Sequence, residues 1–459
     1  MPFTLPLKLY ESYKRATNLL SAYPGIVRVY SHYDADGIAS AGILARTLQR
    51  FGKEFQITCR KNLDAEFSET LKKEKNKLLI IADMGTNIAP QIKEHVEYLI
   101  ILDHHEPSKE IIEMFANNEN IELKNIILLN SHIFGINGTK EACAATMCFL
   151  FSIFCDPVNW DLLPFAIAGC EGDKQNSDGK FYGLNSQIIE EGVSKGIVEK
   201  RKTFAFDGET VYNALSETND PFFMDFVLNP DKLEQLLVKL EIDRNTKILE
   251  LSPEKFKKLV SILALQYIKN NVDINAILTL CQYDYFTKEG VRGKTLANYL
   301  NACGRKGRFE VGIGLFFDFA KYVKEAEVVR NAYRARVREY LVRVLKEGTK
   351  KMEAIQYTWI EEAEYGGAVG GLALTYFLDK TMPVFVLSHR KAQVSISSRG
   401  IDALVRDGLN LGEACRIAAE KCGGTGGGHN IAAGAEVPAG KEEDFLCHAD
   451  EIVKKQMGR

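Results

Sequence analysis

The sequence has no long run of apolar residues and no closely paired cysteines. No stretch approaches the about 20 uncharged apolar residues that span a bilayer, so we expect no membrane partner. The N-terminus also lacks the apolar core and small-residue cleavage site of a secretory signal, which predicts a cytoplasmic protein. The ten cysteines form no C-x-x-C pair, which argues against a zinc ribbon or a thioredoxin motif. We expect reduced thiols, several of them buried.

An excess of positive charge is also missing, since 58 Lys and Arg accompany 61 Asp and Glu, for a net charge of -3. Nucleic-acid-binding proteins are often basic overall, so this balance weighs slightly against that class. It does not exclude the class, because basic residues can cluster locally. Residues 318–347 contain eight Lys and Arg against five Asp and Glu. We expect a long linker helix with a solvated face there; a surface that follows a phosphate backbone is the alternative.

The first 200 residues alternate short apolar runs with helical patterns. We expect strands at VRVY (27–30), KLLIIAD (77–83) and EYLIILD (97–103), and a helix over 37–52. Continuous Ile, Leu and Val runs are typical of strands that are buried on both faces of a parallel sheet. The expected fold class is therefore α/β, with an N-terminal catalytic domain (1–200) that contains an open parallel sheet.

The remaining chain divides into three expected segments. Asn229-Pro230 and Ser252-Pro253 each combine a helix-capping residue with Pro at the first helical position, which predicts a helical insertion over 205–290. Residues 291–350 return to the core and supply the linker helix. The patterns PVFVLSH and AQVSISSR predict strands in a smaller α/β domain over 355–459, with Val394 and Ile396 on its buried face.

Acidic and imidazole side chains occur where three expected strands and one expected helix end. The four sequences are HYDADG, IIADMG, ILDHHEP and AIAGCEGD. Functional groups in open parallel sheets collect at the carboxyl ends of the strands, so we expect these side chains to converge. The candidates are His32, Asp34, Asp36, Asp83, Asp103, His104, His105 and Asp173.

Each motif alone has a structural explanation, since D-x-D-G is commonly a turn and Asp103 could cap a strand end. An EF-hand is excluded because the twelfth position from Asp34 is Ala45 rather than Glu. A zinc peptidase helix is not supported, because H-E-x-x-H is absent from the sequence. The four motifs together indicate a metal site: clustered carboxylates repel one another, and two divalent cations would keep them charged.

The order of these four motifs resembles that of the DHH phosphoesterase superfamily. The resemblance implies two Mn²⁺ ions, with Mg²⁺ as the alternative, because mixed imidazole and carboxylate ligands favour Mn²⁺. It implies that Asp103 fixes His104 from the second coordination shell and that His105 contacts the scissile phosphate, which makes Asp103 and His105 the catalytic candidates. The implied ligands are His32, Asp34 and Asp83 for one ion, and Asp36, Asp83, His104 and Asp173 for the other.

Two motifs near the C-terminus, SISSRG and GGTGGGHN, resemble the substrate-binding domain attached to many DHH phosphodiesterases. Glycines let backbone amides approach an anion closely, although a flexible loop is the simpler explanation of the second motif. DHH pyrophosphatases have a different second domain, which argues against pyrophosphate as the substrate. The resemblance implies that the substrate is bound by Arg399, Gly427, Gly428 and His429.

The segment LANYLNACGRKGR (296–308) resembles the Asn-Ala-x-Gly-Arg motif of RecJ-type exonucleases, which adds Asn301 and Arg305 as substrate contacts. A helix that ends at Gly304 is the structural alternative. The helical insertion is similar in position to that of archaeal RecJ-like proteins. This branch implies the GINS replication complex or a repair helicase as protein partner.

We therefore expect a two-metal exonuclease that hydrolyses single-stranded DNA or RNA from an end, in DNA replication or repair. The alternatives are a phosphodiesterase for short oligonucleotides or cyclic dinucleotides, and a scaffold in a replication complex. The helical insertion favours the exonuclease, because the shorter oligonucleotide hydrolases lack it. The complete set of motif residues argues against a scaffold as the sole role.

Overall fold

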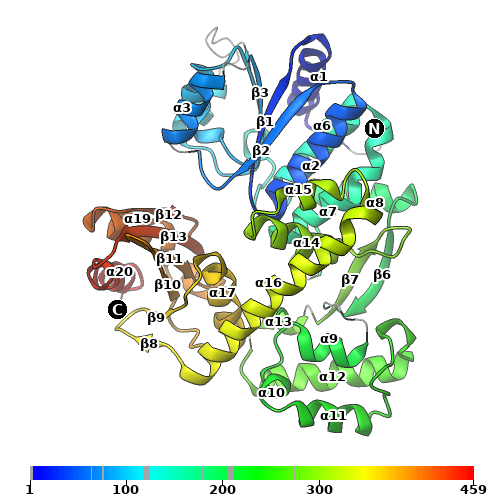
Figure 1. Ribbon diagram of the computed structural model, residues 1–459, viewed down its shortest axis with the longest axis vertical. Coiled ribbons are helices and arrows are strands. Elements are labelled where there is room, and N and C mark those ends of the chain that lie inside the picture. The colour runs from blue at the N-terminus through cyan, green and yellow to red at the C-terminus, as the bar shows by residue number, and fades with distance from the viewer. Residues whose placement is uncertain are drawn as a thin grey trace. The chain divides into compact units, whose positions relative to one another are not determined.

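The computed structural model describes residues 4–458 except 64, 75–76, 117–124, 177–178, 205, 207, 209, 273 and 279. Internal contacts divide the chain into two units. The first unit contains Met1–Thr203 and Gln282–Asn331, and the second contains Phe204–Cys281 and Ala332–Arg459. The expected α/β fold class is confirmed, with a parallel sheet in the first unit and a smaller sheet domain in the second (Figure 1).

Five parallel strands form the sheet of the first unit, in the order β2-β1-β3-β4-β5. The strands are β1 (Val27–His32), β2 (Phe55–Arg60), β3 (Leu78–Ala82), β4 (Tyr98–Asp103) and β5 (Ile126–Asn130). Every residue of β3 and β5 is buried, because the strands are apolar throughout and helices cover both faces. The register aligns Val27 with Leu78 and Leu78 with Tyr98, so the carboxyl ends of the three central strands lie side by side.

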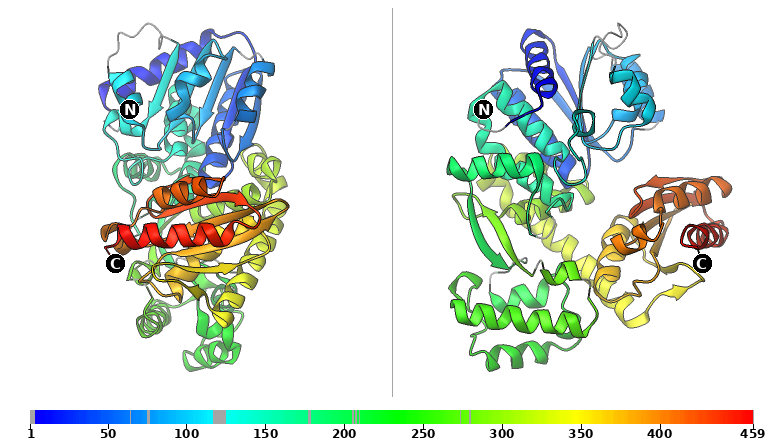
Figure 2. Two further views of the ribbon diagram at one scale, coloured as in Figure 1. Left: turned by 90° about the vertical axis from the view of Figure 1, so that its left-hand side faces the viewer. Right: turned by 180° about the vertical axis from the view of Figure 1, so that it is seen from behind.

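Helices pack on both faces of this sheet (Figure 2). One face contacts α1 (Leu7–Ala22), α2 (Ala35–Arg50) and α6 (Ala144–Cys155), and the other packs against α3 (Ala65–Glu74), α4 (Ala89–Lys93) and α5 (Lys109–Ala116). On the second face, Phe67 and Leu71 of α3 belong to one core with Leu79 and Ile81 of β3. Each such burial stabilises the fold by about 1.5–3 kcal/mol, which makes the sheet a rigid platform for the groups at its edge.

The first unit is completed by four more helices. Beside α2 pack α7 (Leu163–Gly172), α14 (Gly293–Arg305) and α15 (Phe309–Gly314), and α8 (Gly183–Ser194) packs on α7. Helix α14 ends at Arg305 rather than at Gly304, so the expectation of a helix that ends at Gly304 is wrong. A Cβ atom on Gly304 would lie 1.8 Å from the Tyr33 carbonyl oxygen, so this glycine is required for close packing of α14 against the chain after β1.

The second unit contains the helical insertion and the C-terminal domain. The insertion consists of α9 (Val211–Glu217), α10 (Met224–Leu228), α11 (Pro230–Lys239), α12 (Pro253–Lys269) and α13 (Ile274–Leu278), between the paired strands β6 (Glu199–Phe204) and β7 (Cys281–Phe286). Both Pro residues occupy the first helical position, as expected, and Ser252 caps α12 by accepting a hydrogen bond from the Lys255 amide at 3.3 Å. None of the helices in the described part of the chain is long and apolar enough to cross a membrane.

Helix α16 (Phe319–Glu347) is the expected long linker helix. Several of its basic side chains bind partners within the protein: Arg336 pairs with Glu339 and Glu362, and Arg343 pairs with Glu361. Arg338 donates hydrogen bonds to the Ser216 and Thr218 carbonyl groups. These contacts favour a structural role for the basic residues of α16 over a surface that follows a phosphate backbone.

The C-terminal sheet has the order β12-β13-β11-β10-β9-β8. Its strands are β8 (Lys350–Lys351), β9 (Gln356–Trp359), β10 (Val384–Arg390), β11 (Gln393–Arg399), β12 (Thr425–Gly428) and β13 (Ala432–Pro438). Helices α18 (Asp402–Arg406), α19 (Leu411–Lys421) and α20 (Glu442–Gln456) share one core with Val394 and Ile396, and α17 (Gly366–Tyr376) packs on β10 and β11. The expectation of a flexible loop at GGTGGGHN is wrong for Thr425–Gly428, because this backbone pairs with β13 as an edge strand.

Candidate metal centre

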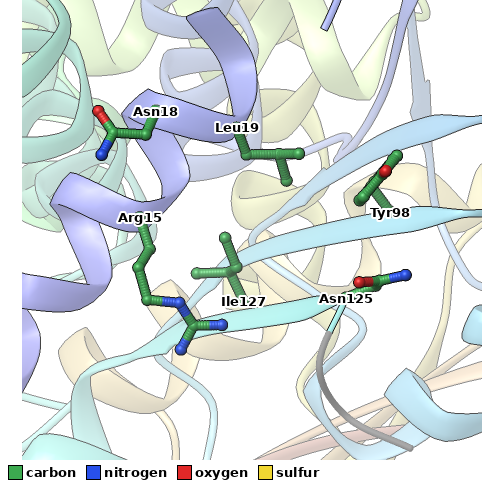
Figure 3. Close-up of a pocket in the computed structure, with 6 residues that line it drawn as sticks. All are labelled: Arg15, Asn18, Leu19, Tyr98, Asn125 and Ile127. Carbon is green, nitrogen blue, oxygen red and sulfur yellow. The ribbon is translucent and has the colours of Figure 1, made fainter. Parts of the chain in front are cut away.

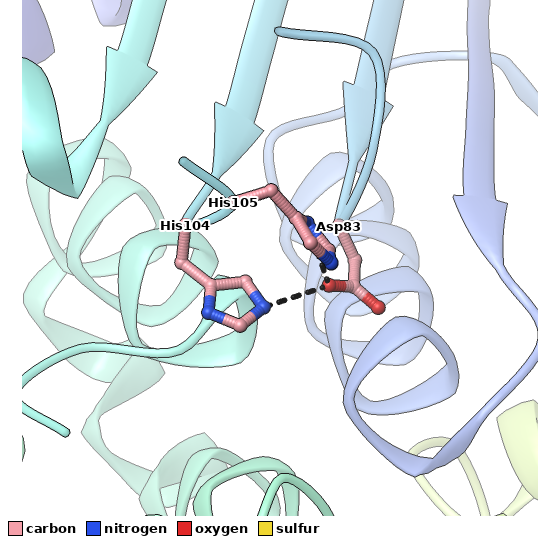
Figure 4. A group of neighbouring side chains, drawn as sticks. All are labelled: Asp83, His104 and His105. Carbon is pink, nitrogen blue, oxygen red and sulfur yellow. Dashed lines mark ion pairs between the residues drawn. The ribbon is translucent and has the colours of Figure 1, made fainter. Parts of the chain in front are cut away.

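The carboxyl ends of β1, β3 and β4 bring together the residues of the four motifs. His32 ends β1, Asp83 directly follows β3, and Asp103 ends β4. Asp36 lies in the first turn of α2, and Asp173 follows the last residue of α7. Figure 4 shows His104 and His105 converging on Asp83 from the neighbouring strand.

His32, Asp34 and Asp83 form one group that can hold a metal ion. The Nδ1 atom of His32 lies 2.9 Å from Asp34 Oδ2 and 3.4 Å from Asp83 Oδ2. One donor atom from each residue lies within 4.8 Å of the others. Asp34 also caps α2, since its Oδ1 accepts a hydrogen bond from the Gly37 amide at 3.0 Å, and this contact fixes the carboxylate at the start of the helix.

A second group surrounds the Nε2 atom of His104. This atom lies 3.2 Å from Asp83 Oδ1, 3.2 Å from Asp173 Oδ2 and 3.8 Å from Asp36 Oδ2. Asp36, His104 and Asp173 meet the same 4.8 Å criterion, as do Asp83, His104 and His105. Asp83 therefore offers Oδ2 to the first group and Oδ1 to the second, which is the position of a ligand shared by two ions.

The backbone of Asp83 is strained. Its φ angle is 60°, in the left-handed region that costs a non-glycine residue about 1–2 kcal/mol. The Asp83 amide donates a hydrogen bond to the Leu102 carbonyl at 2.9 Å, so pairing with β4 holds the residue in this conformation. Strain of this kind concentrates at functional sites, where the surrounding structure imposes it.

The acidic residues of the second group are buried with like charges. Burial, followed by the Asp83 carboxylate, raises the pKa of Asp36 to about 7. Burial and the Asp36 carboxylate raise the pKa of Asp173 well above its usual range. The amides of Ala144 and Ala145 at the start of α6 donate hydrogen bonds to Asp36 at 2.8 and 2.9 Å. These bonds favour the charged carboxylate but do not outweigh burial and repulsion.

The histidines are shifted toward the charged form by the same carboxylates. Burial lowers the pKa of His104, but Asp173 and Asp83 outweigh it and hold the pKa well above its usual value. Burial likewise lowers the pKa of His32, and Asp34 and Asp83 outweigh this effect. The carboxylates thus create a negative potential at these nitrogen atoms, which favours a bound proton or cation there.

This donor set fits divalent cations. Two imidazoles and four carboxylates form two groups, in each of which the donor atoms lie within 4.8 Å of one another, and Asp36 and Asp83 are 0% and 2% exposed. Divalent cations would neutralise the repulsion that raises the pKa of Asp36. Imidazole combined with carboxylate is a ligand set typical of Mn²⁺ and similar transition metals rather than of Ca²⁺.

The contacts of Asp103 differ from those that the resemblance implies. Its Oδ1 atom lies 2.8 Å from His105 Nδ1, whereas its bond to His104 comes from the backbone amide at 2.8 Å. Asp103 therefore holds His104 through the backbone amide rather than through the ring. The carboxylate orients the His105 ring, and the His104 ring faces the Gly138 carbonyl instead. Burial raises the pKa of Asp103, but the His105 and His104 charges outweigh it and the pKa is lowered.

Two buried residues that the sequence analysis missed complete the surroundings of Asp103. The amide and hydroxyl groups of Thr86 donate hydrogen bonds to Asp103 Oδ2 at 3.2 and 2.6 Å. Asn130 Nδ2 donates to Thr86 Oγ1 at 3.0 Å and to the His105 carbonyl at 2.8 Å. Asn130 ends the apolar run IILLN, so the pattern of a polar residue after a buried strand could have identified it.

Arg305 lies close to the first group of ligands. Its NH1 atom donates a hydrogen bond to Tyr33 Oη at 2.5 Å, and its guanidinium lies 4.9 Å from the centroid of the Tyr33 ring. Its charge also contributes to lowering the pKa of Asp34, after burial, which raises the pKa, and His32, which lowers it. Asn301 is four residues earlier on α14 and therefore lies on the same face of that helix.

The other four substrate-binding candidates belong to the second unit. Arg399 pairs with Ala432 across β11 and β13, and Gly428 pairs with Ala433 across β12 and β13. The His429 amide donates to the Ala432 carbonyl at 2.8 Å, and the His429 side chain is exposed. Arg399, Gly427, Gly428 and His429 thus lie at one end of the C-terminal sheet.

A pocket of about 220 Å³ lies at the opposite end of the parallel strands (Figure 3). Tyr98 is the first residue of β4, and Asn125 immediately precedes β5. The lining residues are Arg15, Asn18, Leu19, Tyr98, Asn125 and Ile127. Functional groups collect at the carboxyl ends of parallel strands, whereas this pocket lies at the amino ends. None of these six lining residues is a candidate metal-binding residue.

Comparison with known families identifies two domains in the chain. Residues 26–152 match the DHH family N-terminal domain, and residues 354–455 match the DHHA1 domain. The chain is 34% identical over 441 residues to the uncharacterized protein MJ0831 of Methanocaldococcus jannaschii, and the match covers 95% of each chain. Similarity therefore extends through the insertion and the linker helix as well as the two domains.

Solved structures share the fold at low sequence identity. The CDC45 structure from Entamoeba histolytica superposes with a TM-score of 0.66 at 11% identity, and covers 98% of this chain and 99% of that one. A structure of exonuclease RecJ bound to manganese superposes with a TM-score of 0.58 at 16% identity, and covers 99% of this chain and 96% of that one. At these identities the similarity establishes the fold alone.

Proposed function

Because the chain belongs to the DHH superfamily, in one family with MJ0831, we propose that it is a phosphodiester hydrolase that uses two Mn²⁺ ions, with Mg²⁺ as the alternative. The observation that carries this proposal is the position of Asp83, whose two oxygen atoms face two separate groups of ligands. His32, Asp34 and Asp83 would hold one ion, and Asp36, Asp83, His104 and Asp173 would hold the other.

The protein's own residues then position the phosphate. When bound, two cations lower the pKa of an attacking water and neutralise the charge of the phosphate. The Asp103 carboxylate accepts a hydrogen bond from His105 Nδ1, which directs Nε2 of the same ring away from Asp103. The guanidinium of Arg305, oriented by Tyr33, would bind a phosphate oxygen on the side of Asp34.

We propose that the substrate is single-stranded DNA or RNA, which is hydrolysed from an end. The Asn-Ala-x-Gly-Arg motif supports this proposal, because it places Asn301 and Arg305 on one face of α14. The shared fold with a manganese-bound exonuclease also supports it. The terminal nucleotide would be bound by Arg399, Gly427, Gly428 and His429 of the DHHA1 domain. A role in replication or repair, with the GINS complex or a repair helicase as partner, follows from the same resemblance.

The test is a time course on single-stranded DNA and RNA with Mn²⁺, in which each end is labelled in turn. The proposed exonuclease shortens the strand stepwise from one end. Turnover of dinucleotides without cleavage of long strands would replace the exonuclease by an oligonucleotide phosphodiesterase. Absence of cleavage in both experiments would leave the scaffold as the best explanation. A variant with Asp103→Ala and His104→Ala is the matched inactive control.

A further inference from the structure

A chain of buried polar groups leads from His104 into the core of the first unit. His104 Nδ1 lies 2.7 Å from the Gly138 carbonyl oxygen, which also accepts a hydrogen bond from Gln175 Nε2 at 2.7 Å. Asn185 Nδ2 donates to Gln175 Oε1 at 2.7 Å, and Thr146 Oγ1 donates to Asn185 Oδ1 at 2.6 Å. Gln175 is 1% exposed, and Asn185 and Thr146 are 0% exposed.

The Gly138 carbonyl determines which nitrogen of neutral His104 carries the proton. A carbonyl oxygen only accepts hydrogen bonds, so the proton must be on Nδ1. The lone pair is then on Nε2, the atom that lies 3.2 Å from both Asp83 and Asp173. A metal ligand must present a lone pair, so this tautomer is the one that the second group requires.

The same argument fixes the orientation of both amides. If the Gln175 amide were reversed, its oxygen would face the Gly138 oxygen, and its nitrogen would face the Asn185 nitrogen. Donation therefore runs in one direction, from Thr146 through Asn185 and Gln175 to Gly138. Because the four groups are buried, a wrong orientation would leave polar atoms unsatisfied at a cost of about 1–3 kcal/mol each.

Gly138 lies in a turn rather than in a helix or strand, and Gln175 supplies a side-chain hydrogen bond to its carbonyl group. A Cβ atom at this position would lie 1.9 Å from the His104 carbonyl oxygen, so the turn packs directly against the His104 backbone. Gln175 reaches the turn from the segment that follows Asp173. Gln175, which follows the ligand Asp173 by two positions, thus holds the ligand His104 through Gly138.

We propose that Gln175 and Asn185 are positioning residues that hold the Gly138 carbonyl and thereby fix His104 as a ligand through Nε2. That this arrangement serves to bind a metal ion rests on the proposed function. The arrangement itself is testable without a metal ion, because the tautomer of His104 is an observable property of the protein alone.

The first experiment measures the tautomer of His104 by NMR on full-length protein with ¹⁵N-labelled histidine, at a pH where the ring is neutral. We expect the Nδ1–H tautomer in the wild type and a mixture of tautomers in Gln175→Met, which keeps the chain length but removes the donor. Asn185→Leu should act in the same direction. An Nε2–H tautomer in the wild type, or an unchanged tautomer in both variants, would overturn the proposal.

The second experiment titrates Mn²⁺ and follows binding by electron paramagnetic resonance. Gln175→Met should weaken the binding of the ion near His104 by about 10–100-fold. The affinity for the ion near His32 and Asp34 should be unchanged. Gln356→Met is the matched control, since this buried amide also donates to backbone carbonyl groups, at 2.6 Å to Asp379 and 3.1 Å to Met382. It should lose stability but bind both ions normally.

The two proposals fail in different ways. Wild-type protein that binds no Mn²⁺ would contradict the proposed function, and the comparison of tautomers would then decide the role of Gln175 by itself. Two ions that bind with equal affinity to the wild type and to Gln175→Met, with the same tautomer in both, would leave the metal site standing and refute the positioning role.

Discussion

Replacement of Asp103 by Asn tests whether this carboxylate organises the site. The side chain is 1% exposed and accepts five hydrogen bonds. Three of these reach Oδ1, from the His104 and His105 amides and from His105 Nδ1, and two reach Oδ2 from Thr86. An Asn side chain has nearly the same shape, but its amide nitrogen donates where the carboxylate accepts.

The least costly orientation of the new amide places its nitrogen toward Thr86. The Thr86 hydroxyl can rotate to accept, but the Thr86 amide loses its partner, which costs about 1–3 kcal/mol in a buried position. The bonds to Oδ1 lose their charge assistance, which roughly halves their strength. We therefore expect Asp103→Asn to lower the free energy of unfolding by about 3–5 kcal/mol. Because His105 also loses its charged partner, kcat should fall by about 10–100-fold.

Denaturant titration measures the stability, and cleavage of labelled single strands at a temperature where the variant is folded measures kcat. Asp161→Asn is the control, since Asp161 is 53% exposed and pairs with Arg50 at 2.6 Å on the surface. That change should cost no more than about 1 kcal/mol and leave kcat unchanged. Wild-type stability and kcat in Asp103→Asn would refute the reasoning.

Three further predictions follow from the electrostatics and the ligand groups. In the presence of a chelator, the thermal stability should fall as the pH rises from about 4 to about 7. Burial and Asp83 raise the pKa of Asp36 in the folded state from 3.8 to about 7, so the folded protein binds this proton more tightly than the unfolded chain and loses that advantage as the pH rises. Excess Mn²⁺ should remove the fall, and a thermal stability that rises across this range would contradict the assignment. Asp83→Asn should weaken the binding of both ions in a Mn²⁺ titration, whereas weaker binding of a single ion would show that the two ions do not share Asp83. His429→Ala should raise KM and leave Mn²⁺ affinity unchanged, and an unaltered KM and kcat would remove His429 from the substrate site.

The position of the metal centre could be predicted from the sequence because the geometry of a parallel sheet determines where the ends of its strands meet. Strands that are apolar throughout must be covered on both faces, and their carboxyl ends then meet at one edge. The motifs HYDADG, IIADMG and ILDHHEP place polar residues at the ends of such strands. The structure brings their side chains within a few ångströms of one another.

The surroundings of these ligands could not be predicted in the same way. Asp103 is adjacent to His104 and lies two residues before His105, and only the backbone turn after β4 determines that its carboxylate meets the His105 ring. Gln175 and Asn185 contact each other and Gly138 through tertiary packing, which no spacing in the sequence indicates. The glycines of β12 favour a flexible loop by their intrinsic preference, whereas their strand conformation depends on pairing with β13.

The most direct test of the account is a crystal structure of the protein soaked in Mn²⁺, with anomalous diffraction recorded at the manganese edge. The account predicts two anomalous peaks that share Asp83, one next to His32 and Asp34 and the other next to Asp36, His104 and Asp173. A single peak, or two peaks without a common contact to Asp83, would contradict the two-metal site on which the proposed hydrolysis depends.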